Sequence, residues 1–153
     1  MSVGLTNTFL NKTTKKIIGS SFLGVYPCDQ IPKIRKNKFS LIINTGTHDS
    51  EGEHFVALYF HNNILFYFDP FGEPVANDYI NSFIQELPLK NNRYHFNNRH
   101  IQDNRSNFCG FYCLGFLLSR KSRMSYRQFL NLFSIQKKLE NDKKIVEYIL
   151  KNI

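Results

Sequence analysis

Apolar runs in the first half of the chain predict β-strands. Residues 38–44 (KFSLIIN) are a nearly continuous apolar run, typical of a buried strand. Residues 54–60 (HFVALYF) and 64–68 (ILFYF) are rich in aromatic and β-branched side chains, which favour strands. Residues 61–63 (HNN) lie between these two runs and fit a tight turn, so we expect a β-hairpin over residues 54–68.

After residue 72 the apolar spacing changes from two residues to about 3.6, the period of an α-helix. Strands in the first half, with helices around and after them, indicate an α+β fold. Before and after the hairpin we expect a short helix within residues 5–18, a helix over residues 75–87 that Pro88 ends, and a strand over residues 93–101. Three more helices are expected in the last third of the chain. They are a helix over residues 108–119, a helix through residue 133 that a capping box of Ser125 and Gln128 opens, and a last helix around residues 141–150 with Asn141 as its cap.

Length and composition describe one globular domain over residues 1–153, which we expect to be monomeric. Apolar residues make up 42% of the chain, so it can bury a core, and no apolar stretch is long enough to cross a membrane. The first residues lack the apolar segment and cleavage site of a secretory signal, so we expect an intracellular protein. Three cysteines are too few for a disulfide framework.

The formal net charge is +8, and much of the excess lies between residues 120 and 153. A basic face of this kind fits the neutralisation of nucleic-acid phosphates. It is equally typical of an ordinary solvated helix surface. Both interpretations stay open at this point.

Cys109 is the strongest candidate for a nucleophile, because Gly110 and a helical apolar run follow it directly. The first residue of a helix lies next to unpaired N–H groups, which favour a thiolate. Gly110 leaves room for a substrate. The alternative is a small buried hydrophobic residue, and this is what we expect of Cys113, one helical turn later.

His54 and Asp69 are the candidate partners of this thiol. His54 begins one strand of the expected hairpin and Asp69 follows the other, so an antiparallel register brings both to the same end. The carboxylate can then accept the imidazole N–H and hold the ring in one orientation. Gln102, in the polar loop before Cys109, is a candidate donor to an oxyanion, together with the Cys109 N–H.

A zinc site is the competing interpretation of the same cysteines. Cys109 and Cys113 lie one helical turn apart, and His95 or His100 could add further ligands. The chain has no second Cys or His pair with the spacing of a zinc finger. We therefore expect no metal.

Four stretches of the chain resemble the adenovirus-type maturation protease, adenain, and more loosely the proteases of SUMO and ubiquitin-like modifiers. The order His54, Asp69, Gln102 and Cys109-Gly110 is that of the adenain family. The similar stretches are residues 22–24 (FLG), 42–46 (IINTG) with the histidine shortly after them, 68–72 (FDPFG) and 101–113 (IQDNRSNFCGFYC). The resemblance reaches from about residue 22 to residue 120.

This resemblance implies a central mixed sheet with flanking helices and a catalytic cysteine at a helix N-terminus. It implies an endopeptidase that cleaves capsid or other structural precursor proteins, inside the virion and the infected cell. No cofactor is then required, DNA is a candidate activator through non-specific binding, and no membrane is involved. The residues expected to contact substrate are Gly52, Glu53, Phe55 and Gly110.

The chain departs from the adenain pattern at three places. Asp69 replaces the usual Glu, Phe55 replaces the usual Trp, and the segment between Pro88 and Gln102 lacks the cysteine that bonds an activating peptide. Two other functions therefore stay open. One is an isopeptidase acting on SUMO-type conjugates, and the other is an inactive, basic nucleic-acid-binding structural protein of the same fold.

Overall fold

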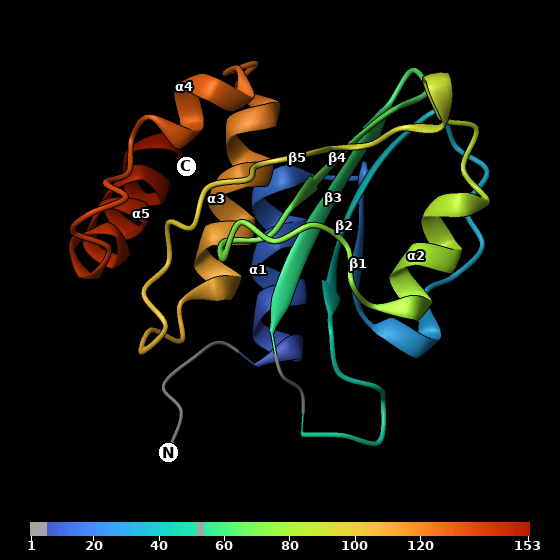
Figure 1. Ribbon diagram of the computed structural model, residues 1–153, viewed down its shortest axis with the longest axis horizontal. Coiled ribbons are helices and arrows are strands. Elements are labelled where there is room, and N and C mark those ends of the chain that lie inside the picture. Colours follow the sequence, from blue (N-terminus) through green and yellow to red (C-terminus); the bar gives the residue numbers. More distant parts are fainter. Residues whose placement is uncertain (1–5, 52–53) are drawn as a thin grey trace.

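A five-stranded mixed sheet forms the centre of the computed structural model, which describes residues 6–51 and 54–153 (Figure 1). The strands lie in the sheet in chain order. They are β1 (Phe22–Pro27), β2 (Lys38–Asn44), β3 (Phe55–His61), β4 (Ile64–Phe68) and β5 (His95–Phe96). The three middle strands are antiparallel, whereas β1 is parallel to β2 and β5 is parallel to β4. The predicted α+β class with a mixed sheet is confirmed.

The hairpin of β3 and β4 is the one that the sequence predicts. Its two turn residues, Asn62 and Asn63, have φ angles of 51° and 67°, as a type I′ turn requires, and asparagine tolerates this conformation. The register pairs His61 with Ile64 and Ala57 with Phe68. The start of β3 and the end of β4 therefore lie at the same end of the sheet.

Helices cover both faces of the sheet (Figure 1). They are α1 (Asn7–Ile18), α2 (Asp78–Gln85), α3 (Cys109–Lys121), α4 (Tyr126–Leu130) and α5 (Leu139–Asn152), with short 3₁₀ turns at Cys28–Gln30 and Lys90–Asn92. Helices α1, α3 and α5 share one apolar core with the sheet, and α2 packs on the other face. Ile42 of β2 lies in the first core, and Leu41 and Ile43 lie in the second. Because both faces of β2 are buried, its sequence is a nearly continuous apolar run.

Helix α3 is the central helix and is buried along most of its length. The Phe116 ring stacks on Phe68 of β4 at a centroid distance of 4.9 Å. On the other side, Gly115 faces α5 so closely that an added Cβ would lie 2.2 Å from Ile145 Cδ1. The sheet and α5 therefore fix the position of α3 from two sides.

The C-terminal end of α3 is closed by a Schellman motif. The Arg123 N–H donates to Arg120 O at 3.1 Å, and the Met124 N–H donates to Ser119 O at 2.9 Å. Arg123 has φ 61°, in the left-handed region where glycine is usual. A residue with a side chain costs about 1–2 kcal/mol in this conformation.

Three sequence predictions differ from the structure, and one strand was not predicted. The strand expected over residues 93–101 shrinks to β5, the helix expected through residue 133 ends at Leu130, and residues 22–27 form a strand that was not expected. Asn141 is not the cap of the last helix, because it lies inside α5 and its side chain binds Ile101 O and Ser134 O, both at 2.7 Å. In the described part of the chain, every helix is too short or too polar for a bilayer crossing.

A tight turn follows β4 and closes over the segment that leads to α3. The Gly72 N–H donates to Asp69 O at 2.7 Å, and Gly72 has φ +72°. A Cβ at Gly72 would lie 2.4 Å from the carbonyl carbon of Arg99, which is a main-chain atom. Glycine is therefore needed here for both its conformation and its small size.

We expect the Gly72→Ala substitution to lower the free energy of unfolding by about 2–4 kcal/mol, since it adds the left-handed strain to an overlap with the main chain. Gly19→Ala is the matched control, because Gly19 also has positive φ (100°) but has no atom within 4 Å of the added Cβ. Urea denaturation of both variants measures the difference. Equal losses in the two would show that the close approach at Gly72 is unimportant.

Candidate active site

His54 and Asp69 meet at the end of the hairpin. His54 directly precedes β3, and its carbonyl accepts a 2.8 Å hydrogen bond from the Thr45 N–H at the end of β2. Its Nε2 lies 2.7 Å from Asp69 Oδ1, and the two side chains are 16% and 10% exposed. The antiparallel register thus makes the contact that the sequence predicts.

Cys109 is the first residue of α3 and is 9% exposed. Its side chain lies near enough to the His54 ring to raise the pKa of the imidazole. Because Nε2 of the ring is engaged by Asp69, the ring nitrogen left for the thiol is Nδ1. The imidazole therefore lies between a carboxylate and a sulfur atom, and the hydrogen bond to the carboxylate sets which ring nitrogen faces the sulfur.

The surroundings of His54 favour its protonated form. Burial alone lowers the pKa of His54, but the hydrogen bonds to Asp69 and Cys109, together with the negative charges of these groups, outweigh burial and raise the pKa from 6.5 to about 9. An imidazolium beside the sulfur favours a thiolate.

Phe71 holds the His54 ring from a third side. Its ring stacks on the imidazole at a centroid distance of 4.5 Å and an interplanar angle of 20°. The Phe71 N–H also donates to Asp69 Oδ1 at 2.8 Å, so this oxygen accepts from both residues. The stacking was not predicted, although Phe71 lies within residues 68–72 (FDPFG), one of the stretches that resemble adenain.

Asn97 fixes the main chain of Asp69. The Asp69 N–H donates to Asn97 Oδ1 at 3.1 Å, and Asn97 Nδ2 donates to Asp69 O at 2.6 Å. The Tyr126 hydroxyl lies 3.3 Å from the same Oδ1. The buried Asn97 side chain thus makes the two main-chain hydrogen bonds to Asp69 that a neighbouring strand would otherwise make, just beyond the end of β5. Nothing in the single sequence distinguished this asparagine from those around it.

Gln102 is buried in the loop before α3, and its amide is directed at Ser106. Its Nε2 donates to Ser106 O at 3.1 Å and lies 3.3 Å from Ser106 Oγ. Ser106 Oγ in turn donates to Asp142 Oδ1 at 2.9 Å, and the Tyr112 hydroxyl donates to the same oxygen at 2.8 Å. This network, which the sequence did not reveal, ties α5 to the loop that carries Gln102.

The residues expected to contact substrate have different surroundings. Gly52 and Glu53 lie outside the described residues. Phe55 is 7% exposed and packs in the core beneath α3, and Gly110 is buried as the second residue of α3. Their contact with substrate stays a prediction.

The described residues contain no group of three or more His, Cys, Asp or Glu side chains arranged to hold a metal ion. Cys28, Cys109 and Cys113 are all free thiols.

A thiol at a helix N-terminus, beside an imidazole that a carboxylate orients, defines the site of a cysteine hydrolase. The sequence matches the model of the adenovirus endoprotease family over residues 22–139, which is most of the chain. The chain therefore belongs to the adenovirus endoprotease family and is a cysteine-type peptidase.

A solved structure shows the same fold. The crystal structure of the ASFV pS273R protease superposes with a TM-score of 0.60 at 15% identity, covering 94% of this chain and 67% of that one. A selenomethionine form of that protease superposes with a TM-score of 0.48 at 19% identity, over 72% of this chain and 44% of that one. No curated protein matches the sequence.

We expect the Asn97→Ala substitution to lower the free energy of unfolding by about 1–3 kcal/mol, because it leaves the Asp69 N–H buried without a partner and leaves only the Gly72 N–H to donate to Asp69 O. Asn104→Ala, at an exposed position in the loop before α3, is the matched control and should change stability by less than about 0.5 kcal/mol. Urea denaturation checks both. A change at Asn97 as small as that of the control would contradict the role assigned to its amide.

Protonation of His54 should make stability depend on pH in a defined direction. Its pKa in the folded protein, about 9, lies above the unfolded value of 6.5. Its stabilising contribution is therefore complete below pH 6.5 and is lost as the pH rises through 9. The stability difference between wild type and Asp69→Asn should be on the order of 1–3 kcal/mol near pH 6 and should shrink toward pH 9.

The nitrogen resonances of the His54 ring give the direct measurement. In wild type they should titrate near pH 9, and in Asp69→Asn they should titrate at lower pH. A His54 ring that titrates at the same pH in both proteins would refute the coupling to Asp69.

Proposed function

We propose that this chain is a cysteine endopeptidase that cleaves structural precursor proteins of a virus particle. Cys109 is the nucleophile, His54 the general base and acid, Asp69 the group that orients His54, and Gln102 a donor to the oxyanion. The contact of the His54 ring with Asp69 on one side and Cys109 on the other carries the proposal. Membership of the adenovirus endoprotease family supports it.

In the first half of the reaction, Cys109 acts as a thiolate and His54 as an imidazolium. The Cys109 sulfur attacks the carbonyl carbon of the scissile peptide, and the C=O electron pair moves onto the oxygen. The tetrahedral intermediate collapses, the C–N bond breaks, and His54 gives its proton to the leaving amine. A thioester on Cys109 remains.

The oxyanion needs donors at the same place as the sulfur. The Cys109 N–H begins α3, where the helix itself offers it no carbonyl partner. Gln102 Nε2 carries two hydrogens and donates to Ser106 O at 3.1 Å and to Ser106 Oγ at 3.3 Å, so it would exchange the longer of these bonds for one to the oxyanion. Water, deprotonated by His54, then attacks the thioester and releases the acid and the free thiol.

The substrate is expected to lie extended beside residues 52–53 and to pair with this edge through its main chain. Precursors of capsid proteins are the substrates we propose, with the virion and the interior of the infected cell as the places of action. The mechanism uses no metal or organic cofactor. The chain is proposed to act as a monomer, and DNA is proposed as an activator that gathers enzyme and substrate on one polyanion.

Two alternatives share the fold. An isopeptidase would use the same four residues on the C-terminal Gly-Gly of a ubiquitin-like modifier. A structural nucleic-acid-binding protein would need none of them to be reactive. The raised pKa of His54 beside Cys109 favours a reactive pair over an inert one.

The test incubates the protein with the capsid precursors encoded in the same genome and, separately, with a ubiquitin-like modifier carrying a C-terminal peptide extension. N-terminal sequencing of the fragments locates each cut. Wild type should cleave a precursor, Cys109→Ser should not, and Gln102→Ala should be slower by about 10²–10³-fold in kcat. Equal cleavage by wild type and Cys109→Ser would end the proposal, and cutting of the modifier alone would favour the isopeptidase.

Alkylation by iodoacetamide at pH 7 tests the inactive alternative without any substrate. Cys109 should react at least about tenfold faster than the other two thiols, and His54→Ala should abolish the advantage. Cys113 is an internal control, because complete burial raises the pKa of its thiol. Cys28 is a second control, since its buried thiol donates to Thr45 O at 3.2 Å. Similar rates at all three cysteines would support the inactive protein.

A further inference from the structure

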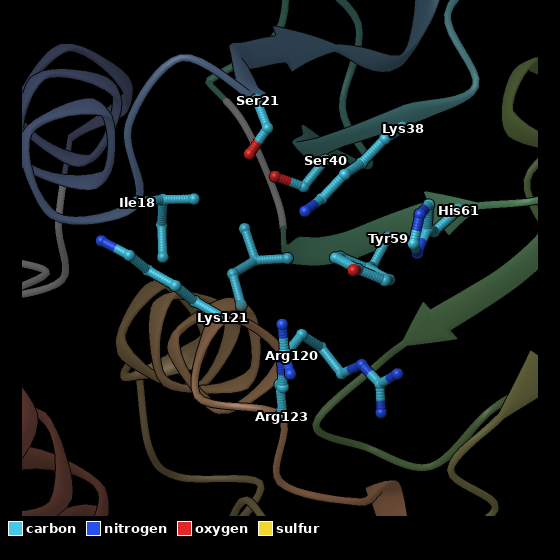
Figure 2. A pocket seen from close by; sticks show the side chains of 10 residues that line it. Ile18, Ser21, Lys38, Ser40, Tyr59, His61, Arg120, Lys121 and Arg123 are labelled. Atoms are coloured by element: carbon cyan, nitrogen blue, oxygen red, sulfur yellow. The ribbon is translucent and has the colours of Figure 1, made fainter.

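A cavity of about 400 Å³ opens at the far end of α3 and β3 from Cys109 and His54 (Figure 2). Small-molecule sites in proteins occupy roughly 300–1,000 Å³, so its size is in the range of a binding site. The strand side contributes Ser21, Ser40 and Lys38, and the helix side contributes Leu117, Arg120, Lys121 and Arg123. Because α3 has 13 residues, the cavity lies about 18 Å from Cys109 along the helix.

The cavity lining is strongly cationic. Lys38, Arg120, Lys121 and Arg123 line it together with His61, and no Asp or Glu does. Within residues 6–51 and 54–153, none of these side chains forms an ion pair with a carboxylate. The C-terminal end of α3 supplies only about half a negative charge, which four full positive charges exceed.

Arg120 is held in place by two aromatic rings, one of which, Tyr59, lines the cavity. Its guanidinium carbon lies 4.4 Å from the ring centroid of Phe66 and 5.2 Å from that of Tyr59. Its Nε is buried without a hydrogen-bond partner. The charge is thus presented in a fixed position, so a ligand would lose less freedom in binding it.

Ser40 provides an independent sign of a missing ligand. It is 2% exposed and lines the cavity, and its Oγ is buried without a hydrogen-bond partner. Buried hydroxyls are nearly always satisfied, and a serine in the middle of an otherwise apolar strand needs an explanation. A bound oxyanion would accept the hydrogen bond that Ser40 Oγ does not make to any residue that the structure describes.

We propose that this cavity, lined by Ser40, Lys38 and the cations at the end of α3, is a binding site for phosphate groups. Its charge, fixed guanidinium and unpaired hydroxyl match a multiply charged phosphate. The phosphate comes either from a free polyphosphate or from the backbone of a nucleic acid. Binding does not depend on the peptidase mechanism, so it is measured without substrate.

The experiment titrates the protein with sodium tripolyphosphate at low ionic strength in a calorimeter. Arg123→Gly and Lys38→Gln should each weaken binding by about tenfold, because each removes a charge-assisted contact. Ser40→Ala should weaken it as well, with no loss of fold stability. Arg123→Gly separates the loss of charge from a loss of stability. Glycine suits the left-handed conformation at this position, so the melting temperature of the variant should be at least that of wild type.

Lys144→Gln is the matched control, because it removes the same charge from α5, away from the cavity. Its affinity should stay within about twofold of wild type. Titration of the same variants with a DNA duplex tests whether the phosphate can come from a nucleic acid. If Arg123→Gly loses affinity for DNA and Lys144→Gln does not, the cavity also binds the nucleic-acid backbone. The proposal fails if neither ligand binds wild type, or if Lys144→Gln loses as much affinity for both as the cavity variants do.

Discussion

The packing of α3 between the sheet and α5 is the constraint on which the rest of the structure depends. Stacking of Phe116 on Phe68 fixes the helix against β4, and the absence of a side chain at Gly115 lets Ile145 close the other side. Close-packed interiors resist small displacements. Cys109 at the start of the helix therefore cannot shift away from His54 unless the core itself opens, and the geometry of the pair is a consequence of core packing.

Polar side chains hold the segments that have no secondary structure of their own. Asn97 pairs with the main chain of Asp69, Asn141 binds Ile101 O, and Asp142 binds Ser106. Each of these side chains is fixed by a neighbouring element and satisfies groups that would otherwise be buried without partners. Side-chain hydrogen bonds thus fix the loops before and after Gln102, where no further strand pairs with them.

The sequence predicted the hairpin, the helix at Cys109 and the meeting of His54 with Asp69, because these follow from local periodicity and antiparallel register. It did not predict Asn97, because that contact joins residues 28 positions apart through a side chain. The expected strand over residues 93–101 was wrong for the same reason: after Phe96 the chain binds its neighbour through Asn97 instead of continuing the ladder. The cap expected at Asn141 was wrong because its amide serves Ile101.

The dipole of α3 affects the groups at both of its ends. Aligned peptide dipoles place partial positive charge at Cys109 and partial negative charge at Lys121, so the helix favours a thiolate at its first residue and cations at its last. Arg120 and Lys121 satisfy the second preference, yet Lys38 comes from β2, outside the helix, and Arg123 occupies a strained position beyond it. Helix electrostatics alone require neither of these two. Their presence at one cavity means that the cationic end suits a negative charge that the described residues do not supply.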